Sequence, residues 1–129
     1  IRKIMNNKIK NKNITFLGVT FKPGTDDMRE SSSLKMIPSL TKKGAHVNYY
    51  EPTGKKKELK SKNINFFENI KDACKSADLI IIHTAWNEFK QLNFKKITKK
   101  RNFKVFDMRN LYSTSEMKKN KINYFSIGR

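Results

Sequence analysis

The sequence ITFLGVTFKPGTDDMRESSS, residues 14–33, decides the fold that we predict for this chain. It opens with a short apolar run, 14–19, whose length and β-branched residues are typical of a strand buried on both faces. A polar loop follows the break at Pro23–Gly24, and the serine triplet 31–33 suits the cap of a helix that begins near Leu34. This order predicts the first half of a βαβ unit, with the loop at the carboxyl edge of a parallel sheet.

The loop of this stretch carries four charged residues, Lys22, Asp26, Asp27 and Arg29. Lys22 offers a mobile point charge and Arg29 a planar fork of N–H donors, and both suit phosphate oxygens or a carboxylate. Backbone N–H groups at the helix start add partial positive charge. The alternative is an ion pair of Arg29 with Asp26 or Asp27 that only holds the loop in shape. The residues alone leave both interpretations open.

The rest of the chain alternates between apolar runs and helical stripes. An apolar stripe predicts a helix over 34–43 that bends at Pro38 and ends at Gly44. The alternation as a whole predicts an α/β fold, a Rossmann-like doubly wound parallel sheet of about six strands in three α/β/α layers. The further elements are expected at 45–50, 64–67, 78–84, 104–106 and 122–127 for strands and at 53–62, 69–76, 94–100 and 114–119 for helices.

The expected strand ends bring more polar residues to the same edge of the sheet. Arg109 follows the strand 104–106, so we expect Lys22, Arg29 and Arg109 to converge there. Three cations at one rim favour a phosphate site. His83 lies at the end of the apolar run 78–84, where we expect a hydrogen-bonded histidine.

Other residues near this edge are expected to serve the structure. Glu51 follows the second strand and should begin a turn with Pro52. An acid at this position holds a ribose in dinucleotide-binding folds, but the first loop here lacks GxGxxG. Trp86 and Phe89 should pack against the sheet edge, with the lining of a pocket as the alternative.

Length and cysteine content set further bounds. A chain of 129 residues fits one domain with a real core, and its start at Ile1 favours a fragment of a longer protein. The single cysteine, Cys74, excludes an intramolecular disulfide, provides no metal-ligand spacing and is expected in the core. A cytoplasmic location follows as the expectation. No apolar run approaches the roughly 20 residues that span a bilayer, so we expect no membrane contact.

The net charge of +18, from 29 basic and 11 acidic residues, is the most conspicuous number in the composition. Basic runs lie at 55–57, 95–101 and 118–121, and none alternates with aromatic residues that would stack on bases. Solvated lysine faces that attract anions in general are therefore expected, without a nucleic-acid partner. The alternative is a basic stand-alone module for nucleic acid or an acidic partner, whose affinity would fall steeply with salt.

Several motifs, taken in their order along the chain, resemble the carboxyl-terminal domain of the UDP-glucose/GDP-mannose dehydrogenase family. The likeness covers residues 14–129 and is closest to the bacterial UDP-glucose 6-dehydrogenases. The motifs are LGVTFKPGTDDMRESSSLKMIPSL at 17–40, GAHVNYYEP at 44–52, TAWNEF at 84–89, VFDMRNLY at 105–112 and YFSIGR at 124–129.

The resemblance implies an activity for the whole enzyme. Members of the family oxidise the C6 alcohol of a UDP-sugar to the carboxylate in two NAD-dependent steps, through a thioester on a cysteine. That cysteine, its partner residues and the GxGxxG domain that binds most of the NAD precede the region seen here. The resemblance therefore implies a UDP-sugar-binding domain without catalytic residues or a metal site, inactive alone. Close alternatives are the UDP-N-acetylmannosamine and GDP-mannose dehydrogenases of the same family.

The resemblance also implies roles for individual residues. The FK pair of the first loop contacts the nucleotide sugar in the family, which points to Phe21 and Lys22, and the arginine of the DxRN segment does so as well, which points to Arg109. The arginine of TDDMRE reaches the NAD, which points to Arg29. Residues 13–129 form the domain, and 1–12 is expected to be the end of a preceding helix or a linker. A homodimer is implied for the full-length enzyme.

Overall fold

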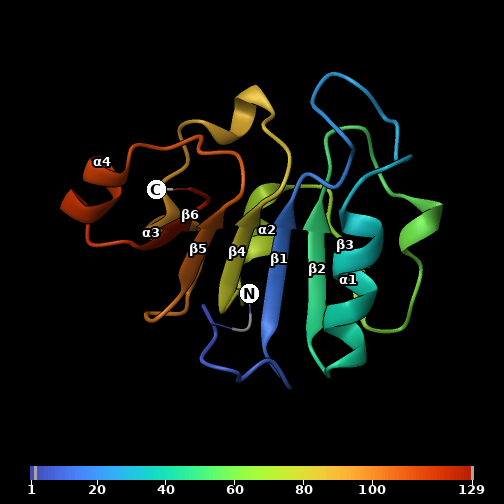
Figure 1. The fold of residues 1–129 in the computed structure, drawn as a ribbon, viewed down its shortest axis with the longest axis horizontal. Helices are drawn as coiled ribbons and strands as arrows, with labels where there is room; N and C mark the ends of the chain where they lie inside the picture. The colour runs from blue at the N-terminus through green and yellow to red at the C-terminus, as the bar shows by residue number, and fades with distance from the viewer. Residues whose placement is uncertain (2, 129) are drawn as a thin grey trace.

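The predicted doubly wound sheet is present. The computed structural model describes Ile1 and residues 3–128, so Arg2 of the segment 1–12 and Arg129 of the YFSIGR motif lie outside the described residues. All strand pairings are parallel, in the order β3-β2-β1-β4-β5-β6 (Figure 1). The strands are β1 Asn13–Leu17, β2 His46–Tyr50, β3 Ile64–Phe66, β4 Leu79–Ile82, β5 Lys104–Asp107 and β6 Asn123–Ser126.

The helices are shorter than predicted in two places. Residues 53–62 form only a 3₁₀ turn, because Leu59 is the one buried residue of that turn and the lysines around it supply no apolar face. The chain leaves the helix predicted over 94–100 at Thr98, where the backbone is extended and the hydroxyl donates to the Ala77 carbonyl. The described helices are α1 Ser33–Lys42, α2 Ile70–Cys74, α3 Phe94–Ile97 and α4 Thr114–Lys119, with the 3₁₀ turns η1 Lys57–Leu59 and η2 Asn87–Phe89.

The start of α1 differs from the prediction. The N-cap residue Ser32 has helical dihedral angles and makes no capping hydrogen bond through its side chain. Of the predicted serine caps, only Ser31 accepts a helical N–H, that of Ser33, at 3.3 Å. Ser31 and Ser33 are buried, and their hydroxyls donate to the Val19 carbonyl at 2.5 and 2.6 Å. The serines therefore attach the helix start to the chain that leaves β1. The end of the helix is as predicted, with Gly44 at φ +94°.

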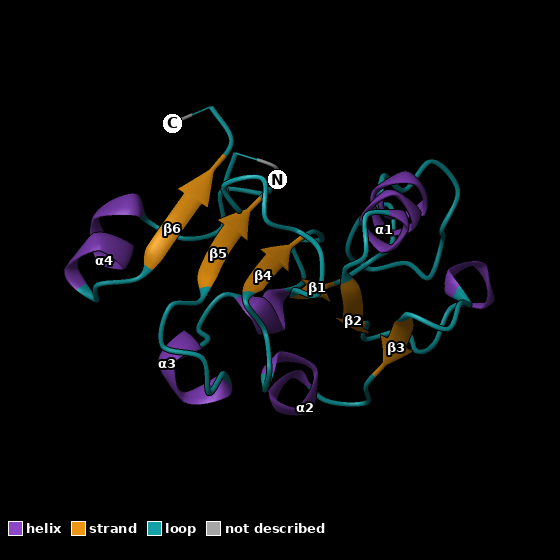
Figure 2. Ribbon diagram, turned by 90° about the horizontal axis from the view of Figure 1, so that it is seen from below, coloured by secondary structure: helices purple, strands orange, loops and turns teal. Residues whose placement is uncertain are grey.

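Two apolar clusters cover the two faces of the sheet. Strand residues alternate between them, so Ile14 and Phe16 of β1 pack on the side of α1, whereas Leu17 packs on the other side. Figure 2 shows α1 on one face and α2 and α3 on the other. Cys74 is fully buried in the second cluster, as predicted.

The described helices are short, and described residues at the start of the chain pack on the sheet. Of the helices that the structure describes, none has the length and apolar character to cross a bilayer. The described residues of 1–12 form turns, not a helix. Met5 and Ile9 of this segment are buried against the α1 face of the sheet.

Candidate functional site at the carboxyl edge

Three loops meet at the carboxyl edge of the sheet. They follow β1, β4 and β5, which are neighbours in space because β4 lies between β1 and β5 (Figure 1). The first loop carries Lys22 and Arg29, the second begins at His83 and the third carries Arg109. The predicted cations therefore share one edge, although they come from distant parts of the sequence.

The peptide of Val19 anchors the first loop. Its N–H donates to Glu51 Oε1 at 2.9 Å, and its carbonyl accepts the two serine hydroxyls described above. Gly18 precedes it with φ +79°, and a Cβ at this position would lie 2.5 Å from Thr84 Cβ. A glycine is required there because the loop passes so close to the end of β4.

Glu51 is a buried carboxylate that the sequence pattern did not reveal. The residue is 1% exposed. Besides Val19, it accepts the backbone N–H of Thr53 at 2.9 Å and the Thr53 hydroxyl at 2.7 Å. Its own carbonyl accepts from Gly54 N–H, which confirms the predicted turn. Glu51 thus ties the end of β2 to the loop after β1, and its position directly after an apolar strand was the only signal in the sequence.

His83 links the second loop to the start of α1. It is fully buried, with Nε2 2.8 Å from Ser32 Oγ and Nδ1 3.1 Å from Thr84 Oγ1. Burial, and secondarily the charge of Arg109, lowers the pKa of His83 to about 4. The imidazole is therefore neutral near pH 7. The predicted hydrogen-bonded histidine is confirmed, and it lies deeper than an edge position.

Arg109 is held at two points. Its Nε donates to the His83 carbonyl at 2.7 Å, and its backbone N–H donates to Asp107 Oδ1 at 3.1 Å. The buried Asp107 carboxylate also accepts from Tyr112 N–H at 3.0 Å and from the Tyr124 hydroxyl at 2.6 Å. These contacts fix the guanidinium through one nitrogen. They leave its two Nη groups available for a ligand, because the side chain is exposed.

Arg29 pairs with Asp27, one of the two partners considered from the sequence. Arg29 Nε and Nη2 lie 3.2 and 3.1 Å from the two carboxylate oxygens, and the Arg29 side chain is 90% exposed. Hydrogen bonds from Arg29 lower the pKa of Asp27, with smaller contributions from the charges of Arg29 and Lys22. An exposed pair of this kind contributes little to stability. It can therefore open for another anion.

Aromatic residues complete the edge. Phe21 is one of the large apolar residues left exposed, at 43%. Phe89 is fully buried in the second apolar cluster, and Trp86 packs against that cluster. The predicted packing of these two residues is confirmed. Trp86 Nε1 is buried without a hydrogen-bond partner among the described atoms.

Known proteins are similar to this chain in sequence. A sequence model of the UDP-glucose/GDP-mannose dehydrogenase family, UDP binding domain, matches residues 15–114. The UDP-glucose 6-dehydrogenase of Rickettsia felis is 38% identical over 132 residues, which cover 99% of this chain and 30% of that protein. The UDP-glucose 6-dehydrogenase of Rhizobium meliloti is 38% identical over 124 residues, which cover 94% of this chain and 28% of that protein.

Solved structures agree with the fold. The UDP-D-ManNAc dehydrogenase of Pyrococcus horikoshii has a TM-score of 0.74 at 26% identity, covering 99% of this chain and 28% of that one. The UDP-glucose dehydrogenase of Pyrobaculum islandicum has a TM-score of 0.74 at 23% identity, and the match covers 96% of this chain and 26% of that one. This similarity supports the fold alone. The chain thus spans about 30% of the length of the relatives it matches.

Proposed function

The chain belongs to the UDP-glucose/GDP-mannose dehydrogenase family, and we propose that it is the UDP-sugar-binding, carboxyl-terminal domain of an NAD-dependent UDP-glucose 6-dehydrogenase. The oxidation itself is assigned to the whole protein, since this chain corresponds to 30% of its relatives' length. The observation that carries the proposal is the Arg109 guanidinium, held by its Nε on the His83 carbonyl with both Nη groups available at the edge. A pre-oriented guanidinium suits the diphosphate of a nucleotide sugar.

In this proposal Lys22 and Arg109 bind the diphosphate from the first and third loops. Lys22 acts as a mobile point charge, whereas Arg109 offers parallel N–H donors in a fixed direction. The exposed ring of Phe21 packs against the nucleotide or the sugar. Glu51 and Asp107 contact no ligand but hold the two loops in position.

Arg29 is assigned to the cofactor. NAD supplies the chemistry of the reaction as the acceptor of hydride from the sugar C6. This chain fits only a small part of NAD, because its one suitable group is an exposed guanidinium whose ion pair with Asp27 can exchange for a phosphate. Most of the cofactor site is therefore assigned to another part of the whole protein.

The sugar is proposed to be glucose. The relatives that are 38% identical are UDP-glucose 6-dehydrogenases. The second candidate is UDP-N-acetylmannosamine, which is favoured by the Pyrococcus horikoshii structure at 26% identity, and GDP-mannose is a further alternative. For the full-length enzyme we propose a cytoplasmic homodimer without nucleic-acid or membrane partners.

Titration calorimetry with UDP-glucose tests the proposal. We expect Lys22→Ala and Arg109→Ala each to weaken binding by about tenfold to a hundredfold, since a charge-assisted hydrogen bond contributes roughly 1.5–3 kcal/mol. Lys75→Ala and Lys119→Ala are the controls, because both residues are exposed and lie where α2 and α4 lead into the amino ends of β4 and β6. Equal affinity in all four variants would contradict the site. Competition by UDP-N-acetylmannosamine and GDP-mannose ranks the sugars.

A further inference from the structure

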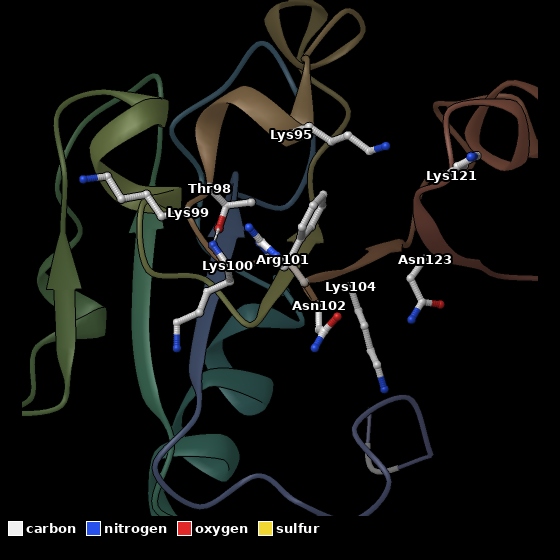
Figure 3. Close-up of a pocket in the computed structure, with 10 residues that line it drawn as sticks. Lys95, Thr98, Lys99, Lys100, Arg101, Asn102, Lys104, Lys121 and Asn123 are labelled. Atoms are coloured by element: carbon white, nitrogen blue, oxygen red, sulfur yellow. Dashed lines mark hydrogen bonds between the residues drawn. The ribbon is translucent and has the colours of Figure 1, made fainter.

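A basic groove lies at the opposite, amino edge of the sheet. Two cavities of about 580 and 330 Å³ adjoin there and share Lys100, Arg101, Asn102 and Lys104. Figure 3 shows the residues that line the larger of the two. Because the carboxyl-edge loops lie at the other ends of the strands, this groove is separate from the site described above. The cations of this basic groove are Lys8, Lys12, Lys95, Lys99, Lys100, Arg101, Lys104 and Lys121.

The cations of the basic groove come from separate parts of the chain. They lie in the segment before β1, in α3 and the loop after it, at the first residue of β5 and in the turn between α4 and β6. The fold thus collects positive charge that no single basic run contains. Such convergence raises the local potential well above that of one solvated lysine face.

Few groups within the basic groove neutralise this charge. The lining contains one carboxylate, Asp78, which accepts from Asn13 N–H at 2.8 Å and pairs with Lys100 at 3.3 Å. Lys104 Nζ donates to the Ile4 carbonyl at 2.5 Å. Among the residues that the structure describes, no carboxylate lies within 4.0 Å of the Lys95, Arg101 or Lys121 side chains.

We propose that the basic groove binds a linear oligophosphate, such as inorganic tripolyphosphate or the phosphate chain of a nucleotide. A volume of about 580 Å³ is in the range of small-molecule sites. Nucleic acid fits less well, because the aromatic residue of the lining, Phe103, is 7% exposed and offers no face on which a base can stack. In this proposal the groove recognises the charge of the phosphate groups and not a base.

Figure 3 separates the cations of the basic groove by direction. Lys95 extends from α3 toward the turn that carries Lys121, and Arg101 lies between these residues and Lys100. Lys99 extends to the other side, away from Lys121. We therefore assign Lys95, Arg101 and Lys121 as the phosphate contacts, and Lys99 serves as an internal control.

Titration calorimetry of the 129-residue chain with sodium tripolyphosphate at 0.15 M salt tests this site. We expect the triple variant Lys95→Ala/Arg101→Ala/Lys121→Ala to weaken binding about tenfold or more. The charge-matched variant Lys55→Ala/Lys57→Ala/Lys60→Ala, whose side chains are exposed near η1, should change it less than about twofold. Lys99→Ala alone should likewise change the affinity less than about twofold. Far-UV circular dichroism verifies that each variant is folded.

Three outcomes would overturn the proposal. Equal weakening by the two triple variants would show attraction by net charge alone, and no weakening by the groove variant would show that the groove is not the site. An oligothymidylate that binds more tightly than tripolyphosphate, with its affinity lost in the groove variant, would make the surface a nucleic-acid site instead. A nucleoside triphosphate and tripolyphosphate compared in the wild type distinguish the two sources of the phosphate chain.

Discussion

Replacing Glu51 by glutamine separates the contribution of its buried carboxylate from that of side-chain volume. One carboxylate oxygen accepts from Val19 N–H, and the other accepts from the N–H and the hydroxyl of Thr53. In Glu51→Gln the remaining oxygen serves only one side, and the amide NH₂ faces a donor on the other. A hydrogen bond to a charged group contributes roughly 1.5–3 kcal/mol, so we expect a loss of about 2 kcal/mol in the free energy of unfolding.

Urea unfolding followed by circular dichroism measures this loss. With an m value of about 2 kcal/mol/M for a chain of this size, the midpoint should fall by about 1 M. Glu51→Ala should lose about 4 kcal/mol, because it also leaves the buried Val19 N–H without an acceptor. Glu68→Gln on the exposed chain before α2 is the matched control and should stay within about 0.5 kcal/mol of wild type. A Glu51→Gln midpoint equal to that of the control would refute the reasoning.

Three further predictions follow from buried or constrained residues. The pKa of His83 in the folded chain is about 4, below its unfolded value of 6.5. Between these values the unfolded chain binds a proton that the folded chain does not bind. The free energy of unfolding, measured by urea titration, should therefore fall by about 2 kcal/mol from pH 7 to pH 5. His83→Gln should remove this fall and His46→Gln should retain it. Burial raises the pKa of Cys74 from 9.0 to about 12, so iodoacetamide at pH 8 should label the native thiol about a thousandfold more slowly than the urea-unfolded one. Equal rates would contradict its burial. Gly18→Ala should lower the free energy of unfolding by about 3 kcal/mol or more in thermal unfolding, since the new Cβ would lie 2.5 Å from Thr84 Cβ. Gly24→Ala, at φ +81° with open space around it, should lower it by about 1 kcal/mol. Similar losses in the two variants would show that the close contact has no effect.

The sequence predicted what depends on periodicity and missed what depends on partners far along the chain. The burial of β1 and β4 on both faces follows from their continuous apolar runs, so the parallel sheet and its carboxyl edge were predictable. The serines before α1 have a strong local preference for capping. Their hydroxyls instead find the Val19 carbonyl 12 and 14 residues away, which only the folded chain brings near. The contact of Glu51 with Val19, 32 residues apart, escaped for the same reason.

The two arginines of the carboxyl edge differ in how they are held, and this difference supports the separate roles that we propose for them. Arg109 is oriented before any ligand arrives, because its Nε is fixed on the His83 carbonyl and its backbone on the buried Asp107. A group oriented in this way loses little entropy on binding, which suits a ligand that the domain must bind by itself. Arg29 is 90% exposed and paired only with Asp27 of its own loop. Such a pair gives up little free energy when it opens. In the proposed role, Arg29 can therefore turn toward an anion held by another part of the whole protein.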